Sequence, residues 1–224
     1  VYDDLDQDGR DIAVVIAKGL FGAIPGIGSG ISEIVGYVIP KQRQDRVIDF
    51  VKKLAAKVED HDDIIQRMQT PEGADLSEEA MLQASRAHTD ARREYIASLL
   101  ENSLNKNEID HYEKKKLFNL LSQLNDHEII FLKYYSLNRT LGSKHPFFIK
   151  HYDILEPVRK TLNRSEEDSR KDAFRESYKD TLLSLRLIQS RGDIFSTTPL
   201  GNLLLNYIQV PDEVEPSGEI MPYE

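Results

Sequence analysis

One stretch near the amino end constrains this chain more than any other. Residues 19–40 read GLFGAIPGIGSGISEIVGYVIP, and the only charged side chain among these 22 residues is that of Glu33. A helix of this length could cross a bilayer. However, six of the chain's 12 glycines and Pro25 lie within the stretch, and both residue types weaken a helix in water. The stretch is therefore poorly suited to an exposed soluble helix.

Two structures are compatible with this composition. Glycines recur every four residues at Gly22, Gly26 and Gly30, a spacing that lets membrane helices approach closely. The first six residues, GLFGAI, also resemble the start of viral fusion peptides. We predict that the stretch associates with membranes or drives assembly, through Gly19, Leu20, Phe21, Gly22, Gly26, Gly30 and Glu33. The alternative is a Gly-rich apolar hairpin packed inside a helical core.

Composition excludes several classes of protein. The chain has 224 residues and no cysteine, which rules out a disulfide scaffold, thiol catalysis and any cysteine-ligated metal. We expect a cytoplasmic protein, with the Gly-rich stretch allowing a location peripheral to the inner membrane. The net charge of -9 argues against a surface built throughout for nucleic acid.

Charge is uneven along the chain. Residues 1–110 carry a net charge of −8, residues 111–210 carry +4 and the last fourteen carry −5. Together with the Gly-rich stretch, this predicts four regions: an apolar amino-terminal segment (1–43), a helical region (44–107), a mildly basic domain (108–210) and an acidic tail (211–224). We expect the tail to be disordered or laid on the basic domain. The first residue is Val1 rather than Met, which suggests that residues precede it.

Apolar residues at steps of three and four predict helices from residue 41 onward. The expected helices cover 42–68 (ended by Pro71 and Gly73), 77–87, 90–104 (with Thr89 as N-cap), 108–124 and 126–135 (opened by a capping box of Asn125 and Glu128). Residues 41–135 should therefore form four or five helices and no strand.

The carboxyl-terminal region combines a helix, a turn, a short strand and a second helix. Residues 178–189 should be helical, Ser-Arg-Gly-Asp and Ile-Phe-Ser-Thr should form a hairpin near 188–197, and Thr198 should cap a helix that starts at Pro199. This order resembles the winged-helix family over residues 121–210, with 126–135 as the first helix and 165–189 as the long one. The predicted fold class is mainly α, a multi-helix amino-terminal region followed by a winged-helix-like domain with a small β-hairpin.

The resemblance implies that the long helix would read DNA. Its basic residues alternate with acidic ones, however, which is typical of a solvated face with many ion pairs. We expect contact with a partner protein, or packing within the chain, ahead of DNA. The candidates for contact with phosphates or a partner are Lys144, Lys150, Arg159 and Lys160.

A second resemblance covers most of the chain. The segments IPGIGSGISEI, IPKQRQDR, REYIASLL and LNDHEIIFL are similar to bacterial proteins of the Abi-alpha-like type, some of which are associated with abortive infection against phage. This implies a defence or regulatory role, and no functional residue can be transferred from it.

No motif of the sequence supports catalysis. Asp4-x-Asp6-x-Asp8-Gly9 begins like a calcium loop but has Val15 where the bidentate glutamate is needed. We therefore expect no metal, no cofactor, no small-molecule substrate and no enzymatic activity. The chain is interpreted as a non-enzymatic bacterial defence or toxin-like protein that acts on membranes or by assembling into an oligomer. The alternative is a winged-helix regulator that binds DNA or a partner protein.

Overall fold

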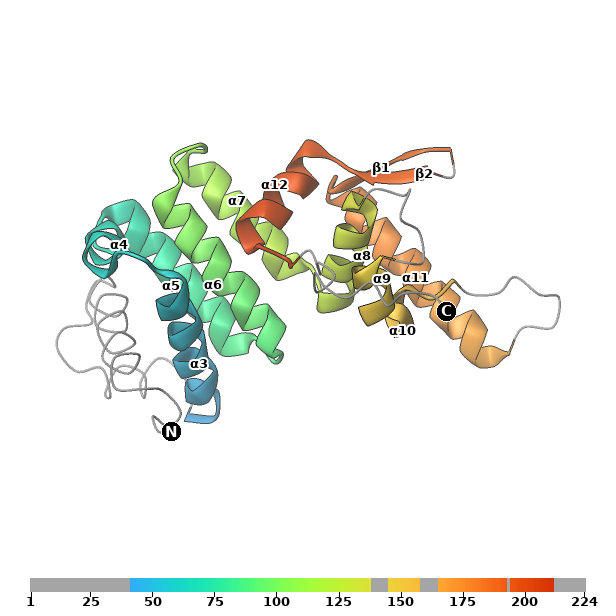
Figure 1. Cartoon of the computed structure of the whole chain (residues 1–224), viewed down its shortest axis with the longest axis horizontal. Helices are drawn as coiled ribbons and strands as arrows, with labels where there is room; N and C mark the ends of the chain where they lie inside the picture. Colours follow the sequence, from blue (N-terminus) through green and yellow to red (C-terminus); the bar gives the residue numbers. More distant parts are fainter. Residues whose placement is uncertain (1–40, 138–144, 158–164, 193, 212–224) are drawn as a thin grey trace, which may run out of the picture. The chain divides into compact units, whose positions relative to one another are not determined.

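A computed structural model describes residues 41–137, 145–157, 165–192 and 194–211 (Figure 1). Both predictions for residues 19–40 lie outside these ranges. Within them the chain is mainly α-helical with one two-stranded antiparallel hairpin near the carboxyl end, as predicted. The helices are α3 (Lys41–Lys57), α4 (His61–Met68), α5 (Pro71–Arg86), α6 (Asp90–Asn105), α7 (His111–Gln123), α8 (Asp126–Ser136), α9 (Pro146–Lys150), α10 (Tyr152–Leu155), α11 (Glu166–Ser184) and α12 (Pro199–Ile208). The strands are β1 (Ile188–Arg191) and β2 (Ile194–Thr197).

The described residues form two compact units. The first comprises residues 41–123 together with Asn206–Gln209, and the second runs from Leu124 to Leu205 and resumes at Val210.

The first unit is built on three helices that pack against one another, α3, α5 and α6. Each presents an apolar stripe, and fully buried side chains from these stripes, among them Phe50, Leu54 and Leu99, form the core. Ion pairs join α3 to α6 at the surface: the Lys53 ammonium lies 3.0 Å from the Asp90 carboxylate, and Arg93 pairs with Asp49. Apolar burial therefore supplies the core, and the ion pairs add a surface contact between α3 and α6.

The expectation of one helix over 42–68 was wrong. The chain leaves the helix after Lys57 and starts a new one at His61, because the Asp60 side chain accepts from the backbone N–H groups of Asp62 and Asp63. Thr70 caps α5 in the same way, so Pro71 begins a helix rather than ending one. Residues 41–135 consequently form six helices instead of four or five, and no strand.

Two predicted helix starts are confirmed. The Thr89 hydroxyl accepts from the N–H of Arg92 at the start of α6. At the start of α8 the Asn125 side chain accepts from the N–H of Glu128, while the Glu128 carboxylate accepts from the N–H of Asn125. Both caps satisfy N–H groups that have no partner within the helix.

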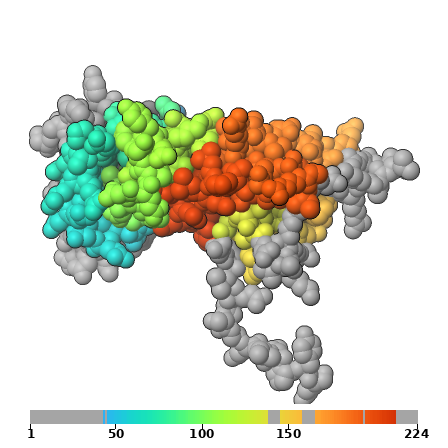
Figure 2. Space-filling view, turned by 90° about the horizontal axis from the view of Figure 1, so that it is seen from above, coloured from blue at the N-terminus to red at the C-terminus, as the bar shows by residue number. Residues whose placement is uncertain are grey.

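The second unit places α11 and strand β2 against α8, with β1 beside α11. In Figure 2 the orange-red carboxyl-terminal residues lie beside the orange residues of α11 on one face. The hairpin pairs Ile188 with Thr197 and Arg191 with Ile194. Thr198 caps α12, which starts at Pro199, so the predicted hairpin and final helix are confirmed.

The long helix of this unit ends earlier than expected, at Ser184 rather than at residue 189. Arg186 has a φ of 57° and the Leu187 N–H bonds back to the Leu182 carbonyl, which turns the chain out of the helix. Leu187, the last residue before strand β1, and Ile188, the first residue of that strand, are both buried.

Candidate functional site

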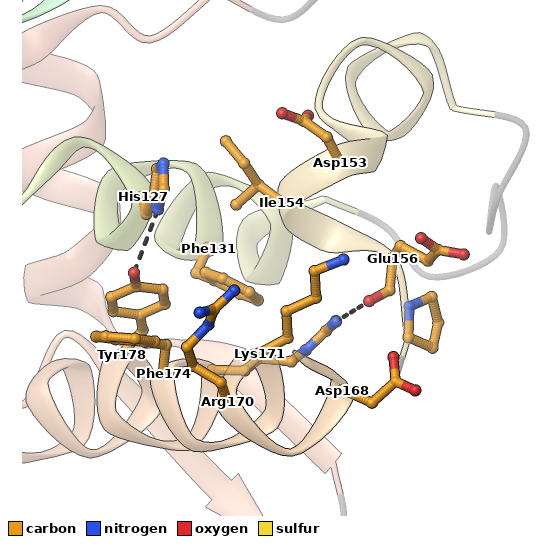
Figure 3. Close-up of a pocket in the computed structure, with 12 residues that line it drawn as sticks. His127, Phe131, Asp153, Ile154, Glu156, Asp168, Arg170, Lys171, Phe174 and Tyr178 are labelled. Atoms are coloured by element: carbon orange, nitrogen blue, oxygen red, sulfur yellow. Dashed lines mark hydrogen bonds between the residues drawn. The ribbon is translucent and has the colours of Figure 1, made fainter. Parts of the chain in front are cut away.

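A surface pocket of about 420 Å³ lies in the second unit among α8, the end of α10 and α11 (Figure 3). Helix α11 supplies half of the lining residues, and Arg170, Phe174 and Tyr178 share one face of the helix because they follow one another at intervals of four residues. The start of this helix is fixed by Ser165, whose hydroxyl accepts from the Asp168 N–H and donates to the Asp168 carboxylate. The position of the pocket therefore depends on where α11 begins, on the face that this helix presents, and on the residues of α8 and α10 that pack against it.

Three aromatic rings, with Ile154 and Pro157, form the apolar part of the pocket. Phe131 of α8 is almost fully buried, and its ring centre lies 5.8 Å from that of Tyr178. Phe174 stacks on Tyr178 with ring centres 6.2 Å apart, yet its side chain is 56% exposed. The rings therefore run from the core to the surface, and Phe174 is the end that solvent reaches.

Arg175 ties α11 to the end of α10. Its guanidinium donates to the carbonyl oxygen of Leu155 at 2.8 Å and to that of Glu156, and it lies 5.2 Å above the centre of the Phe131 ring. The carbonyls at a helix end have no partner within the helix, and a guanidinium is suited to bind two of them together. Arg175 is thus a structural residue that holds the two sides of the pocket together.

The other cations of α11 differ in their partners. Lys171 lies 2.9 Å from Glu167, and the hydrogen bond between them lowers the pKa of Glu167 and raises the pKa of Lys171. Lys179 pairs with Glu176 and sits 5.6 Å above the Phe195 ring. The Arg170 guanidinium forms no hydrogen bond or ion pair with any described residue, and its side chain reaches into the pocket (Figure 3).

His127 borders the pocket on the α8 side. Its Nδ1 atom lies 3.2 Å from the Tyr178 hydroxyl, and the two rings meet edge to face. This contact orients Tyr178 from outside the aromatic row. Across the described ranges no group of three or more His, Asp or Glu side chains is arranged to hold a metal ion. The pocket offers apolar contact and the guanidinium of Arg170, and its rim also carries the carboxylates of Asp153, Glu156 and Asp168.

The residues predicted to carry function lie mostly outside the described ranges. These are the seven of the Gly-rich stretch, Gly19, Leu20, Phe21, Gly22, Gly26, Gly30 and Glu33, and three of the four contact candidates, Lys144, Arg159 and Lys160. Lys150 is described and lies exposed at the end of α9, where it has an interaction partner. It does not line the pocket.

Sequence reasoning missed the pocket, although one signal was present. Phe174 is a large apolar residue in the middle of a helix whose other exposed residues, apart from Ala173, are polar or charged, and Tyr178 follows it by one turn. A single exposed aromatic residue is ordinary on a protein surface, and Phe174 becomes a candidate contact because it lies at the edge of a pocket with Phe131 and Tyr178.

Comparison with known proteins gives no relative: no family model, curated protein or solved structure matches the chain. Among the helices of the described ranges, none is both long and apolar enough to cross a membrane.

Proposed function

We propose that this chain acts by binding rather than by catalysis, and that its second unit is a winged-helix-like module that binds a partner protein. The order α8, α11, hairpin and α12 supports the module type. The observation that carries the binding proposal is the ring of Phe174, 56% exposed at the edge of a pocket that also contains Phe131 and Tyr178. Aromatic and arginine side chains are enriched at the residues that dominate binding between proteins.

The occupant we propose is a short segment of a partner that presents one apolar side chain beside a carboxylate. The apolar side chain would cover Phe174 and Tyr178. The carboxylate would pair with Arg170, because the guanidinium of Arg175 is already bound to backbone carbonyls and Lys171 is paired with Glu167. A bidentate pair between arginine and a carboxylate adds directional specificity to the apolar contact.

DNA is the less favoured partner on the charges of α11. The helix carries six acidic and four basic residues. Lys171 and Lys179 pair with acidic neighbours, and Arg175 is bound to backbone carbonyls. Few phosphates could be neutralised, so DNA binding is expected to be weak, tolerant of sequence and lost as salt rises.

A selection of displayed random peptides on the purified chain tests the proposal, with the variant Phe174→Asp in parallel. We expect enriched peptides that share an apolar residue followed closely by an acidic one and that do not bind F174D. Ile194→Asp is the matched control, because Ile194 is equally exposed at 55% but lies on β2 outside the pocket. The control variant should bind the peptides like the unaltered chain.

Two results would overturn this assignment. The first is a selection that enriches no peptide family, or that enriches only peptides to which F174D binds as tightly as the unaltered chain. The other comes from a mobility shift on the same preparation: DNA binding that persists at about 200 mM salt would assign the second unit to nucleic acid.

We propose a second activity for the Gly-rich stretch 19–40: it associates with membranes or drives self-assembly, in a protein of the phage-defence or toxin type. The observation in favour is its sequence, 22 residues with one charge and glycines repeating every four residues. Glu33 would face a partner helix, a pore or the membrane interface, because burying its carboxylate against lipid costs several kcal/mol, on the order of 3.

Leakage of anionic liposomes and sedimentation of the chain in solution test this second activity. The double variant Gly26→Leu, Gly30→Leu should lose leakage or self-association and keep the circular dichroism of the helices. Full activity of the folded variant, or a native chain that neither binds liposomes nor associates with itself, would show that the stretch has only a structural role.

A further inference from the structure

The first unit contains a pocket that the proposed function does not use. It has a volume of about 360 Å³ and lies where the junction of α4 and α5 faces the end of α6 and the start of α7. The polar and charged residues of its lining include Arg67, Thr70, Ser103, Asn107, His111 and Lys114, and Leu76 and Leu104 add apolar surface.

Two cations line this pocket, Arg67 and Lys114, and of the two only Arg67 has a carboxylate partner among the described residues. Arg67 donates from Nε to Asp63 at 2.7 Å and from Nη1 to the carbonyl oxygen of Leu104 at 3.1 Å, which fixes its guanidinium at the wall. The Lys114 ammonium forms no hydrogen bond or ion pair with a residue of the described ranges. Burial and the neighbouring charge of Arg67 lower the pKa of Lys114. The folded chain thus holds two positive charges close enough to repel each other.

Two carboxylates next to the pocket pair with groups of its lining or with Lys115, and neither pairs with Lys114. Asp63 pairs with Arg67, and Asp75 pairs with both Lys115 and the Nε2 atom of His111. Glu72, in the first turn of α5, is the one carboxylate among the lining residues. No described acidic side chain forms an ion pair with Lys114.

Two polar atoms of the lining residues are buried without a partner. The Ser103 hydroxyl belongs to a residue that is 1% exposed and has no hydrogen-bond partner, and the Nδ1 atom of His111 has none either. A buried hydroxyl without a partner costs free energy, and such groups in a native protein call for an explanation. A negatively charged ligand in the pocket would offset the repulsion between the two cations, and a rotation of the Ser103 side chain would let its hydroxyl donate to that ligand.

We propose that this pocket binds the phosphate group of a small ligand, held by Arg67 and Lys114 with the Ser103 hydroxyl as a further donor. The start of α5 lies at the same pocket and adds its positive dipole end. Arginine and lysine together supply the directional and the point-charge contacts that phosphate oxygens accept. Binding here is independent of the partner-binding pocket of the second unit.

Titration of the full chain with inorganic phosphate at constant ionic strength tests the proposal, followed by amide NMR shifts and by the thermal midpoint. We expect saturable shifts at Ser103, Asn107 and Lys114 and a rise in the midpoint, because a ligand of the folded state stabilises it. Lys114→Gln should weaken binding at least about tenfold, the loss of one charge-assisted hydrogen bond. Lys116→Gln, the same change at an exposed site of α7, should bind like the unaltered chain.

The variants also separate a binding role from a structural one. Without phosphate, K114Q should be at least as stable as the unaltered chain, because the partly buried ammonium repelled by Arg67 is gone. Glu72→Gln should bind phosphate more tightly, since it removes the carboxylate of the lining. Phosphoserine and adenosine monophosphate identify the source: tighter binding of either indicates a larger phosphorylated ligand, and equal affinity indicates the free anion. Absence of saturable shifts, or equal binding by K114Q and K116Q, would overturn the proposal.

Discussion

The side-chain amide of Asn102 donates to the backbone carbonyl oxygen of Tyr207 at 3.1 Å, across 105 positions of the chain. The same amide nitrogen donates to the Ser98 carbonyl oxygen at 2.9 Å, and Asn102 is only 3% exposed. One buried side chain of α6 thus satisfies a carbonyl at the end of α12, within the first unit. A buried carbonyl without this donor would lose its hydrogen bond with no water to replace it.

Replacing Asn102 by alanine should lower the free energy of unfolding by about 1–3 kcal/mol, because it leaves the Tyr207 carbonyl unpaired and opens a small cavity. Asn105→Ala is the matched control on the same helix, since Asn105 is exposed and its amide contacts only Glu101 among the described residues. Urea denaturation of both variants measures the difference. Equal stability of the two variants would show that the end of α12 is held by apolar burial alone.

The side chain of Tyr207 predicts a change in stability of the opposite sign. Its hydroxyl is buried without a hydrogen-bond partner, and burial, with the charges of Glu108 and Glu113, raises its pKa. Tyr207→Phe removes this hydroxyl and keeps the ring below the Lys106 ammonium, 5.1 Å from its centre. We expect Y207F to be as stable as the unaltered chain or more stable, by up to about 1 kcal/mol in urea denaturation. A clear loss of stability would mean that the hydroxyl has a partner in solution.

The ion pairs between α3 and α6 predict a dependence of stability on pH. The hydrogen bond with Lys53, together with the charges of Lys53 and Arg93, lowers the pKa of Asp90 below its ordinary value of 3.8. The folded state therefore binds the Asp90 proton less readily than the unfolded state does. This contribution is complete above the ordinary pKa and is lost as the pH falls through the lower folded value.

Asp90→Asn should remove that acid-side part of the pH dependence, and Glu59→Gln should keep it, because Glu59 is exposed and pairs with no described residue. The effect will be small and weakened by salt, since the Asp90 side chain is 74% exposed. Urea midpoints measured from neutral pH down to about pH 3 for the three chains provide the comparison. Identical curves for the native chain and D90N would contradict the assignment.

Sequence predicted the structure best where the signal is local. The caps at Thr89, Asn125 and Thr198 each act within three residues of the capping side chain, so the residues that form them are adjacent in the sequence. The break at Asp60 was missed because apolar residues continue at helical spacing on both sides of it. The new helix nevertheless changes which residue faces inward, since Ile64 is buried and Ile65 is not.

The two pockets could not be predicted in this way, because their contacts are tertiary. Arg175 reaches carbonyls 19 and 20 positions away, at the end of a helix of four residues that is too short to show any periodicity. Lys114 and Arg67 come from separate helices, and nothing in either segment indicates that two cations meet. The one local signal was Phe174, a large apolar side chain that is exposed. It was overlooked because the alternating charges of its helix were interpreted as a solvated face.

A close approach at the start of α12 gives the last prediction. A Cβ atom at Gly201 would lie 2.1 Å from the Leu187 carbonyl oxygen, which also accepts from the N–H and the hydroxyl of Thr198. Gly201→Ala would gain about 1 kcal/mol of helix propensity but would force the helix away from the base of the hairpin. We expect a net loss of about 2–3 kcal/mol in urea denaturation, as for overpacked cores.

Gly192→Asn is the control for this effect. Gly192, in the hairpin turn, has a φ of 62°, and a Cβ atom added to it would meet no other atom within 4 Å. Asparagine adopts this left-handed conformation more readily than most residues, so the change should alter stability by less than about 1 kcal/mol. If G201A were as stable as G192N, the helix would have to move away from Leu187 at little cost, and the tight seat of α12 against the hairpin would not be a source of stability.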